Sequence, residues 1–152
     1  ISDSVLEFLA AGGEILLVTT PEPTSITDSY SLLKALSRHP RYNKETTSIR
    51  MIANRVLKEE DGRNLFQMLN AVGERYLKMP ISYLGSIPQD DKLLRAVMQQ
   101  TPVSLQSPTA KSSLAYEEMA HKLMNKDEEA KQPRRGMAAF FSHIVNARRT
   151  IQ

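Results

Sequence analysis

The sequence predicts an α/β fold with a parallel sheet, because three short apolar runs each lead into a helical pattern. The runs cover residues 15–19, 49–56 and 83–87. Strands that alternate with helices of ordinary length favour parallel βαβ units. Each run stops at polar or proline-containing residues that join it to the next helix. In open α/β sheets, ligands bind at such joins, which follow the carboxyl ends of the strands.

The first strand is preceded by a helix that begins almost at the first residue, with Ser2 or Asp3 placed to cap it. Gly12 and Gly13 end this helix. The run that follows is apolar on both faces, as expected of a buried parallel strand. An exposed edge of this kind would pair with other chains, so we expect a neighbouring strand from a segment outside this sequence.

The second strand is flanked by two predicted helices. The first has apolar residues at helical spacing until His39 and Pro40 stop it, and Thr24, Ser25 or Thr27 can cap it. After the strand, the charged residues 58–62 predict a solvated loop, and residues 64–77 predict a helix that Pro80 ends.

The third strand is followed by a short helix capped by Asp90 or Asp91 and by a second helix over residues 109–124. We expect residues 1–125 to form one body, 126–132 a charged linker, and 133–149 an amphipathic helix that begins at Pro133.

Composition excludes several classes of protein. No apolar run approaches the roughly 18 residues of a membrane-spanning helix, and the absence of cysteine excludes disulfides and thiolate metal sites. The net charge is +3, from 20 basic and 17 acidic residues. Residues 131–152 hold five Arg or Lys and no acid, so the rest carries 15 basic against 17 acidic residues. We therefore expect attraction to anions in the tail rather than in the body.

The motifs at the joins resemble those of one known family. They are residues 21–28 (PEPTSITD), 54–56 (NRV), 83–90 (YLGSIPQD) and 95–97 (RAV). In this order and spacing they resemble the C-terminal half of the MinD/ParA-type P-loop ATPases of the SIMIBI class, and most closely the branch of flagellar number and placement regulators called FlhG, YlxH or FleN. No Gly-x-x-x-x-Gly-Lys-Ser/Thr loop occurs in the chain, which fits a fragment without the phosphate-binding half.

The resemblance implies a site for the base of ATP or ADP. It assigns Asn54 to the purine edge, with Arg55 beside it and Pro88, Gln89 and Asp90 covering the other side of the ring. An amide suits this role because it offers a donor and an acceptor together. The residues alone leave a second interpretation open, in which Asn54 ends a strand and Asp90 caps a helix.

The resemblance also implies an ATP-dependent dimer. It places Pro21, Glu22 and Asp28 at the interface between protomers, whereas turn formation and helix capping explain the same residues without a partner. No catalytic residue is expected in this chain, because the phosphate loop and the Mg²⁺ ligands would lie upstream, and the chain by itself is expected to be inactive. His39, His121 and His143 show no metal-ligand spacing, so no metal site is expected.

The tail has an apolar face with arginines at both ends. The face holds Met137, Phe140, Phe141, Ile144 and Val145, and the arginines are Arg134, Arg135, Arg148 and Arg149. This pattern is typical of a helix that lies in an anionic membrane surface, although such a stripe more often packs on the protein's own body. We rank nucleic acid below lipid, because the aromatic residues do not alternate with the basic ones.

Together these features predict part of a cytoplasmic ATPase that dimerises on ATP, binds the inner membrane surface and regulates flagellar placement or number. Resemblance adds flagellar basal-body proteins and an SRP-type GTPase as partners. Two alternatives stay open: a ParA-like DNA-partitioning ATPase whose basic tail contacts DNA, and an α/β interaction module without enzymatic activity.

Overall fold

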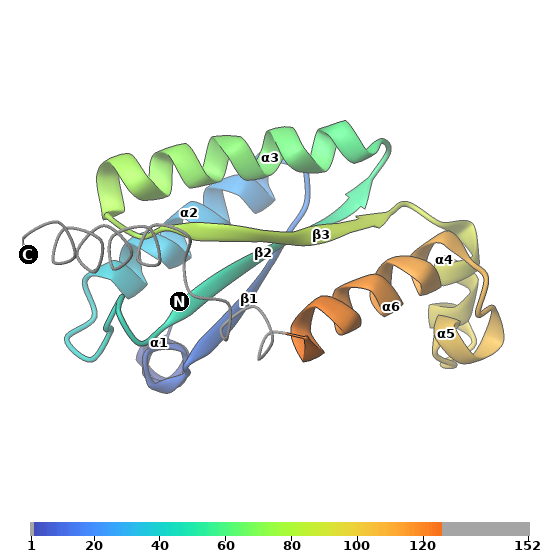
Figure 1. Ribbon diagram of the computed structural model, residues 1–152, viewed down its shortest axis with the longest axis horizontal. Coiled ribbons are helices and arrows are strands. Elements are labelled where there is room, and N and C mark those ends of the chain that lie inside the picture. Colours follow the sequence, from blue (N-terminus) through green and yellow to red (C-terminus); the bar gives the residue numbers. More distant parts are fainter. Residues whose placement is uncertain (1, 126–152) are drawn as a thin grey trace, which may run out of the picture. The chain divides into compact units, whose positions relative to one another are not determined.

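A three-stranded parallel sheet is the centre of the structure (Figure 1). The structure, a computed structural model, describes residues 2–125, and residues up to Met119 form one compact unit. The strands are β1 (Glu14–Thr19), β2 (Ser48–Val56) and β3 (Ile81–Pro88), in the order β1-β2-β3. All three predicted strands are therefore confirmed, with β1 and β2 each one residue longer than predicted and β3 three residues longer.

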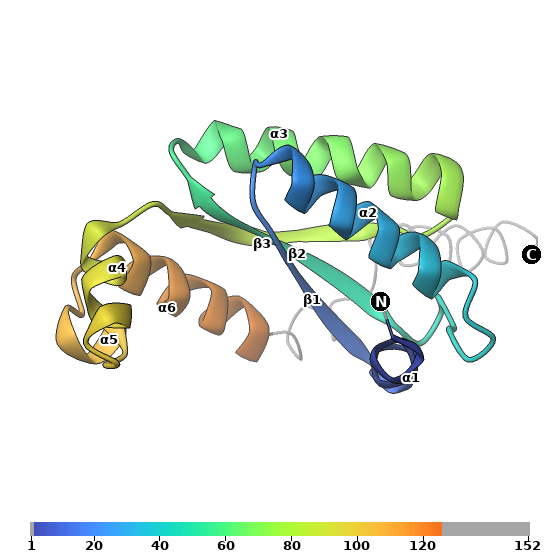
Figure 2. The same ribbon diagram turned by 180° about the vertical axis from the view of Figure 1, so that it is seen from behind.

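Two helices cover one face of this sheet. They are α2 (Pro23–Ser37) and α3 (Glu59–Val72), and they lie on the same side of the strands in both views (Figures 1 and 2). The core between them and the sheet is apolar, with Leu33, Leu36 and Met51 almost completely buried. Burial of this kind is the main favourable term in folding.

The other face of the sheet is covered unevenly. On β3, the absence of a side chain at Gly85 lets Met119 of α6 (Lys111–Met124) approach closely. On β1, Leu16 and Val18 are 45% and 53% exposed. The prediction that both faces of β1 are buried is therefore wrong for the described residues, because only β2 pairs with β1 and no described helix covers these two side chains.

Two helix starts differ from the predictions. Helix α2 begins earlier than expected, with Pro23 in its first turn and Glu22 as its N-cap residue, so Thr24, Ser25 and Thr27 lie inside it. Helix α3 begins at Glu59, within the stretch predicted to be a loop. The acidic first turn of α3 favours the helix through the macrodipole, and the Asp61 carboxylate accepts a hydrogen bond from the Lys58 N–H at 3.0 Å.

The remaining helices are short, and they are α1 (Asp3–Ala11), the π-helix η1 (Gly73–Leu77), α4 (Asp91–Met98) and α5 (Val103–Gln106). Ser2 is the N-cap residue of α1, as predicted, but its side chain makes no capping hydrogen bond. Within residues 2–125, no helix has the length and apolar character needed to cross a bilayer.

Candidate functional site at the carboxyl ends of the strands

The three joins predicted to carry function lie at one edge of the sheet, because the strands are parallel and end together. In register, Asn54 of β2 faces Ile87 of β3, and Val56 faces Pro88. Irregular pairing between Asn54 and Val56 interrupts the ladder at this point. Such bulges re-aim side chains at the ends of strands.

The join between β1 and α2 is held by hydroxyl groups. The Thr19 side chain is almost completely buried, and its Oγ1 lies 3.0 Å from the Ser25 Oγ. The Thr20 N–H donates to the same Ser25 oxygen at 3.0 Å. These bonds fold the three-residue turn back onto the start of α2, which places Glu22 at the edge of the sheet.

Glu22 and Arg55 form an ion pair that links the ends of β1 and β2. The Arg55 Nη1 donates to the Glu22 Oε1 at 3.1 Å, and the Thr20 hydroxyl donates to the Glu22 Oε2 at 2.9 Å. Both charged side chains are more than half exposed, so the pair contributes at most about 1 kcal/mol to stability. We therefore interpret the pair as a means of orienting the two side chains.

The backbone at Arg55 is left-handed, with φ of 57°. Few residues other than glycine adopt this conformation, because it brings Cβ close to the backbone. The Asn54 side chain supports it, since its Oδ1 accepts a hydrogen bond from the Arg55 N–H at 2.9 Å. Within the described residues the Asn54 NH₂ group has no partner, so it remains a donor at the edge of the sheet.

Asp90 caps two helices at the end of β3. Its Oδ1 accepts from the Lys92 N–H at 2.8 Å, and its Oδ2 accepts from the N–H and the hydroxyl of Ser112, at 3.1 and 2.9 Å. Chiefly through the Ser112 N–H, these bonds hold the pKa of Asp90 below its ordinary value. The predicted capping role of Asp90 is confirmed, and it now includes the first turn of α6.

A cavity of about 650 Å³ lies beside this cap. Gln89 and Asp90 line it together with three cationic side chains, Lys92, Arg95 and Lys111, while Asn54, Arg55 and Pro88 do not. The Gln89 N–H donates to the Val56 carbonyl at 2.9 Å, so the cavity and the end of β2 are joined through the backbone. The structure thus brings Gln89 and Asp90 together and keeps Asn54 on the neighbouring strand end.

Sequence reasoning missed the three cations of this cavity. Lys92 and Arg95 are three residues apart on α4, a spacing that places them on one helix face. That spacing is the feature of the sequence from which two of the three cations could have been predicted to lie together. Lys111 comes from the start of α6, and only the fold brings it to the same cavity.

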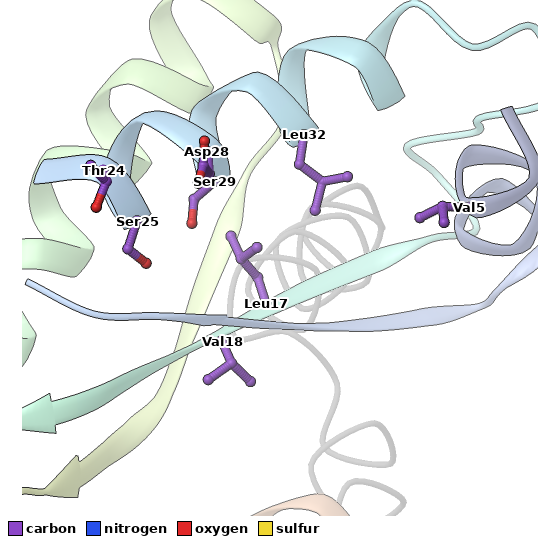
Figure 3. A pocket seen from close by; sticks show the side chains of 8 residues that line it. All are labelled: Val5, Leu17, Val18, Thr24, Ser25, Asp28, Ser29 and Leu32. Carbon is purple, nitrogen blue, oxygen red and sulfur yellow. The ribbon is translucent and has the colours of Figure 1, made fainter. Parts of the chain in front are cut away.

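The residues predicted at a dimer interface separate in the structure. Asp28 lines a second cavity, of about 500 Å³, between α1, β1 and α2 (Figure 3). In that view Leu17 points toward α2, and Val18 points to the opposite side of β1. Pro21 lies exposed in the turn and Glu22 pairs with Arg55, so neither lines this cavity. The predicted tail residues, 134–149, lie outside the described part of the chain.

Comparison with known proteins gives the family. The chain is 42% identical over 123 residues to the antiactivator FleN of Pseudomonas aeruginosa, an alignment that covers 81% of this chain and 42% of FleN. It is 29% identical over 141 residues to the flagellum site-determining protein YlxH of Helicobacter pylori, covering 91% of this chain and 46% of YlxH. The solved structure of the Pyrococcus furiosus cell division ATPase MinD has the same fold, with a TM-score of 0.53 and 20% identity over 76% of this chain and 44% of that one.

The chain belongs to the MinD/ParA family. It spans less than half the length of the relatives described above. No family profile matches it. The predicted fold, part of a MinD-like parallel sheet with flanking helices, is confirmed by the likeness to solved MinD/ParA structures.

A MinD/ParA nucleotide site requires groups for the base, the phosphates and Mg²⁺. At this edge the Asn54 amide suits a purine, which presents both donors and acceptors, because the amide offers an NH₂ donor and an oxygen acceptor. Within residues 2–125, no three histidine or carboxylate side chains are arranged to hold a metal ion.

Proposed function

We propose that this chain is the base-binding part of an ATPase that dimerises on ATP, attaches to the inner membrane surface from the cytoplasm and regulates flagellar placement or number. The observation that carries the proposal is the 42% identity to FleN, which extends over 81% of the chain. The likeness to YlxH, whose name refers to the site of the flagellum, supports the same role.

In this proposal the ends of β2 and β3 have different roles in binding the base. The Asn54 NH₂ donates to a ring nitrogen of adenine, and its oxygen, which has a second lone pair beside the bond to Arg55, accepts from the exocyclic amine. The segment 88–90 closes over the ring, held in place because Asp90 is tied to Lys92 and Ser112. Mg²⁺ and the phosphate loop supply the chemistry of hydrolysis and are assigned to the part of the protein outside this chain.

The proposed dimer rests on two acidic side chains near the start of α2, and the proposed membrane attachment rests on the sequence of the tail. Glu22 and Asp28 are both exposed, so a partner or the rest of the protein can reach them. A helix of the kind that the tail sequence predicts would have marginal affinity for lipid. Two such helices on one dimer bind more tightly through effective concentration, so ATP-driven dimerisation would switch attachment on.

The base-binding role of Asn54 is tested with Asn54→Asp in the full-length protein. Aspartate retains the acceptor for the Arg55 N–H but removes the NH₂ donor, so we expect ADP to bind about tenfold more weakly, the equivalent of one hydrogen bond. Calorimetric titration with ADP measures the change. Asn64→Asp, at an exposed position of α3, introduces the same charge and is the matched control. If the two variants bound ADP with equal affinity, Asn54 would not be part of the base-binding site.

The membrane role is tested by co-sedimentation of the full-length protein with anionic vesicles in ATP and in ADP. We expect Phe140→Glu to abolish the ATP-dependent binding, because a charge on the apolar face opposes insertion. Leu105→Glu, at a position that is 75% exposed on α5, serves as the control and is expected to bind normally. Salt-sensitive binding to DNA that Phe140→Glu leaves unchanged would instead favour the ParA-like alternative.

A further inference from the structure

A third cavity lies at the opposite edge of the sheet, where β2 and β3 begin. Its volume is about 640 Å³, and its walls are the loop between α2 and β2 and the segment that joins η1 to β3. A cavity of this size is within the range of small-molecule sites. The polar side chains that line it are Ser37, Arg41, Tyr42, Asn43, Lys44 and Lys78.

The two segments that form this cavity are basic. The loop between α2 and β2, residues 38–47, holds three Lys or Arg and one acid, Glu45, and the segment 78–80 holds Lys78 and no acid. Arg41 is neutralised by Glu7 of α1, whose Oε2 lies 2.7 Å from the Arg41 Nη1. Lys44 and Lys78 have no ion-pair partner among residues 2–125. Two unpaired cations therefore line one cavity, although residues 1–125 as a whole carry equal numbers of basic and acidic residues, 14 of each.

Neutral donors accompany these cations. The Asn43 Oδ1 accepts from the Glu45 N–H at 2.9 Å, which leaves the Asn43 NH₂ group as a donor. Burial raises the pKa of Tyr42, so its phenol stays protonated and able to donate. Lysine ammonium groups with nearby neutral donors are a suitable set for the oxygens of a phosphate group.

The backbone positions Lys78 in an unusual way. Lys78 follows the π-helix η1 and has φ of 57°, a left-handed conformation that favours glycine. Its capping N–H donates to the Gly73 carbonyl. A π-helix and a strained residue both occur often at functional sites. Here a lysine occupies a position at which glycine would be less strained, and that lysine lines the cavity.

We propose that this cavity binds a phosphate-bearing ligand, with Lys44 and Lys78 as its cations and Tyr42 and Asn43 as neutral donors. The site is separate from the proposed nucleotide site, because it lies where the strands begin and not where they end. A soluble phosphate compound and the headgroup of an anionic lipid share this chemistry.

The test is lysine footprinting of the full-length protein, saturated with ADP so that its nucleotide site is filled. Inorganic pyrophosphate is the soluble probe, and mass spectrometry reports the rate at which each lysine is acylated. We expect the acylation rates of Lys44 and Lys78 to fall about threefold when pyrophosphate is at twice its Kd, because only the free site reacts. Lys92 and Lys111, which line the cavity at the other edge, are the internal controls and are expected to react at unchanged rates.

The variant Lys78→Gly separates binding from folding. Glycine accepts the left-handed backbone, so we expect the melting temperature to stay the same or rise while the protection of Lys44 is lost. Lys111→Gln, which removes a cation at the opposite edge, is expected to leave that protection intact. Undiminished protection of Lys44 in Lys78→Gly, or equal protection of Lys92 and Lys111, would overturn the proposal.

A second arm identifies the source of the phosphate. The same footprint is taken with phosphatidylglycerol vesicles and with phosphatidylcholine vesicles. Protection of Lys44 and Lys78 by pyrophosphate assigns the site to a soluble ligand, and protection by the anionic vesicles alone assigns it to a lipid headgroup. Protection by neither probe rejects the site.

Discussion

Replacing Gly62 by valine is expected to lower the free energy of unfolding by about 3 kcal/mol, through overpacking between α3 and the sheet. A Cβ atom at this position would collide with the Ser86 Oγ, and it would lie 2.8 Å from the Tyr83 Oη and 3.2 Å from the Ala53 Cβ. Ser86 and Tyr83 are hydrogen-bonded to each other, so neither side chain can move without losing that bond. Denaturation with urea measures the change.

Gly13 provides the matched control for this substitution. No atom lies within 4 Å of a Cβ added at Gly13, so Gly13→Val is expected to change stability by no more than about 0.5 kcal/mol. The clash itself is tested by combining Gly62→Ala with Ser86→Ala, which removes the nearest atom. The double variant should be more stable than the sum of the single effects predicts. Equal stability of Gly62→Val and Gly13→Val would show that α3 does not approach the sheet this closely.

Replacing Asp90 by alanine is expected to lower the free energy of unfolding by about 2 kcal/mol, because two caps are lost at once. The Lys92 N–H loses its acceptor, and so do the N–H and hydroxyl of Ser112, a residue with no exposed surface. Asp91→Ala is the control, since Asp91 lies in the first turn of α4 and is not the residue that caps it. If both variants were equally stable, the double cap would be disproved.

The pH dependence gives a second measure of the same cap. The pKa of Asp90 in the folded protein lies below its value in the unfolded chain, chiefly through the Ser112 N–H. The unfolded chain therefore binds the proton more tightly, and the stabilisation is complete above the unfolded pKa of about 4. This stabilisation is lost as the pH falls through the pKa that Asp90 has in the folded protein. The stability difference between the native protein and Asp90→Ala should accordingly shrink as the pH is lowered from 6 toward 3.

The strands and their common edge could be predicted because their signals are local. An apolar run that ends at a polar residue identifies a strand, and parallel pairing then places residues such as Asn54 and Gln89 at one edge. The start of α3 was missed because its charged residues suit both a loop and an acidic helix N-terminus. The complete first turn of α3 distinguishes a helix from a loop, and in it the Asp61 carboxylate accepts a hydrogen bond from the Lys58 N–H.

Features that depend on distant segments could not be predicted. Glu22 and Arg55 are 33 residues apart in sequence, and they meet because β1 and β2 pair in parallel and end side by side. Lys44 and Lys78 share a cavity only because two loops precede neighbouring strands. The exposure of Leu16 was missed for a related reason: an apolar residue in a strand does not reveal whether a helix covers it.

The incomplete cover of β1 has a practical consequence for protein engineering. Leu16 and Val18 lie outside the core that α2 and α3 form with the sheet, whereas Leu17, between them, belongs to it. When this chain is prepared alone, its solubility can therefore be improved at two positions of this strand without a cavity being created beneath it. Threonine suits both, because its branched side chain keeps the extended backbone while its hydroxyl is hydrated.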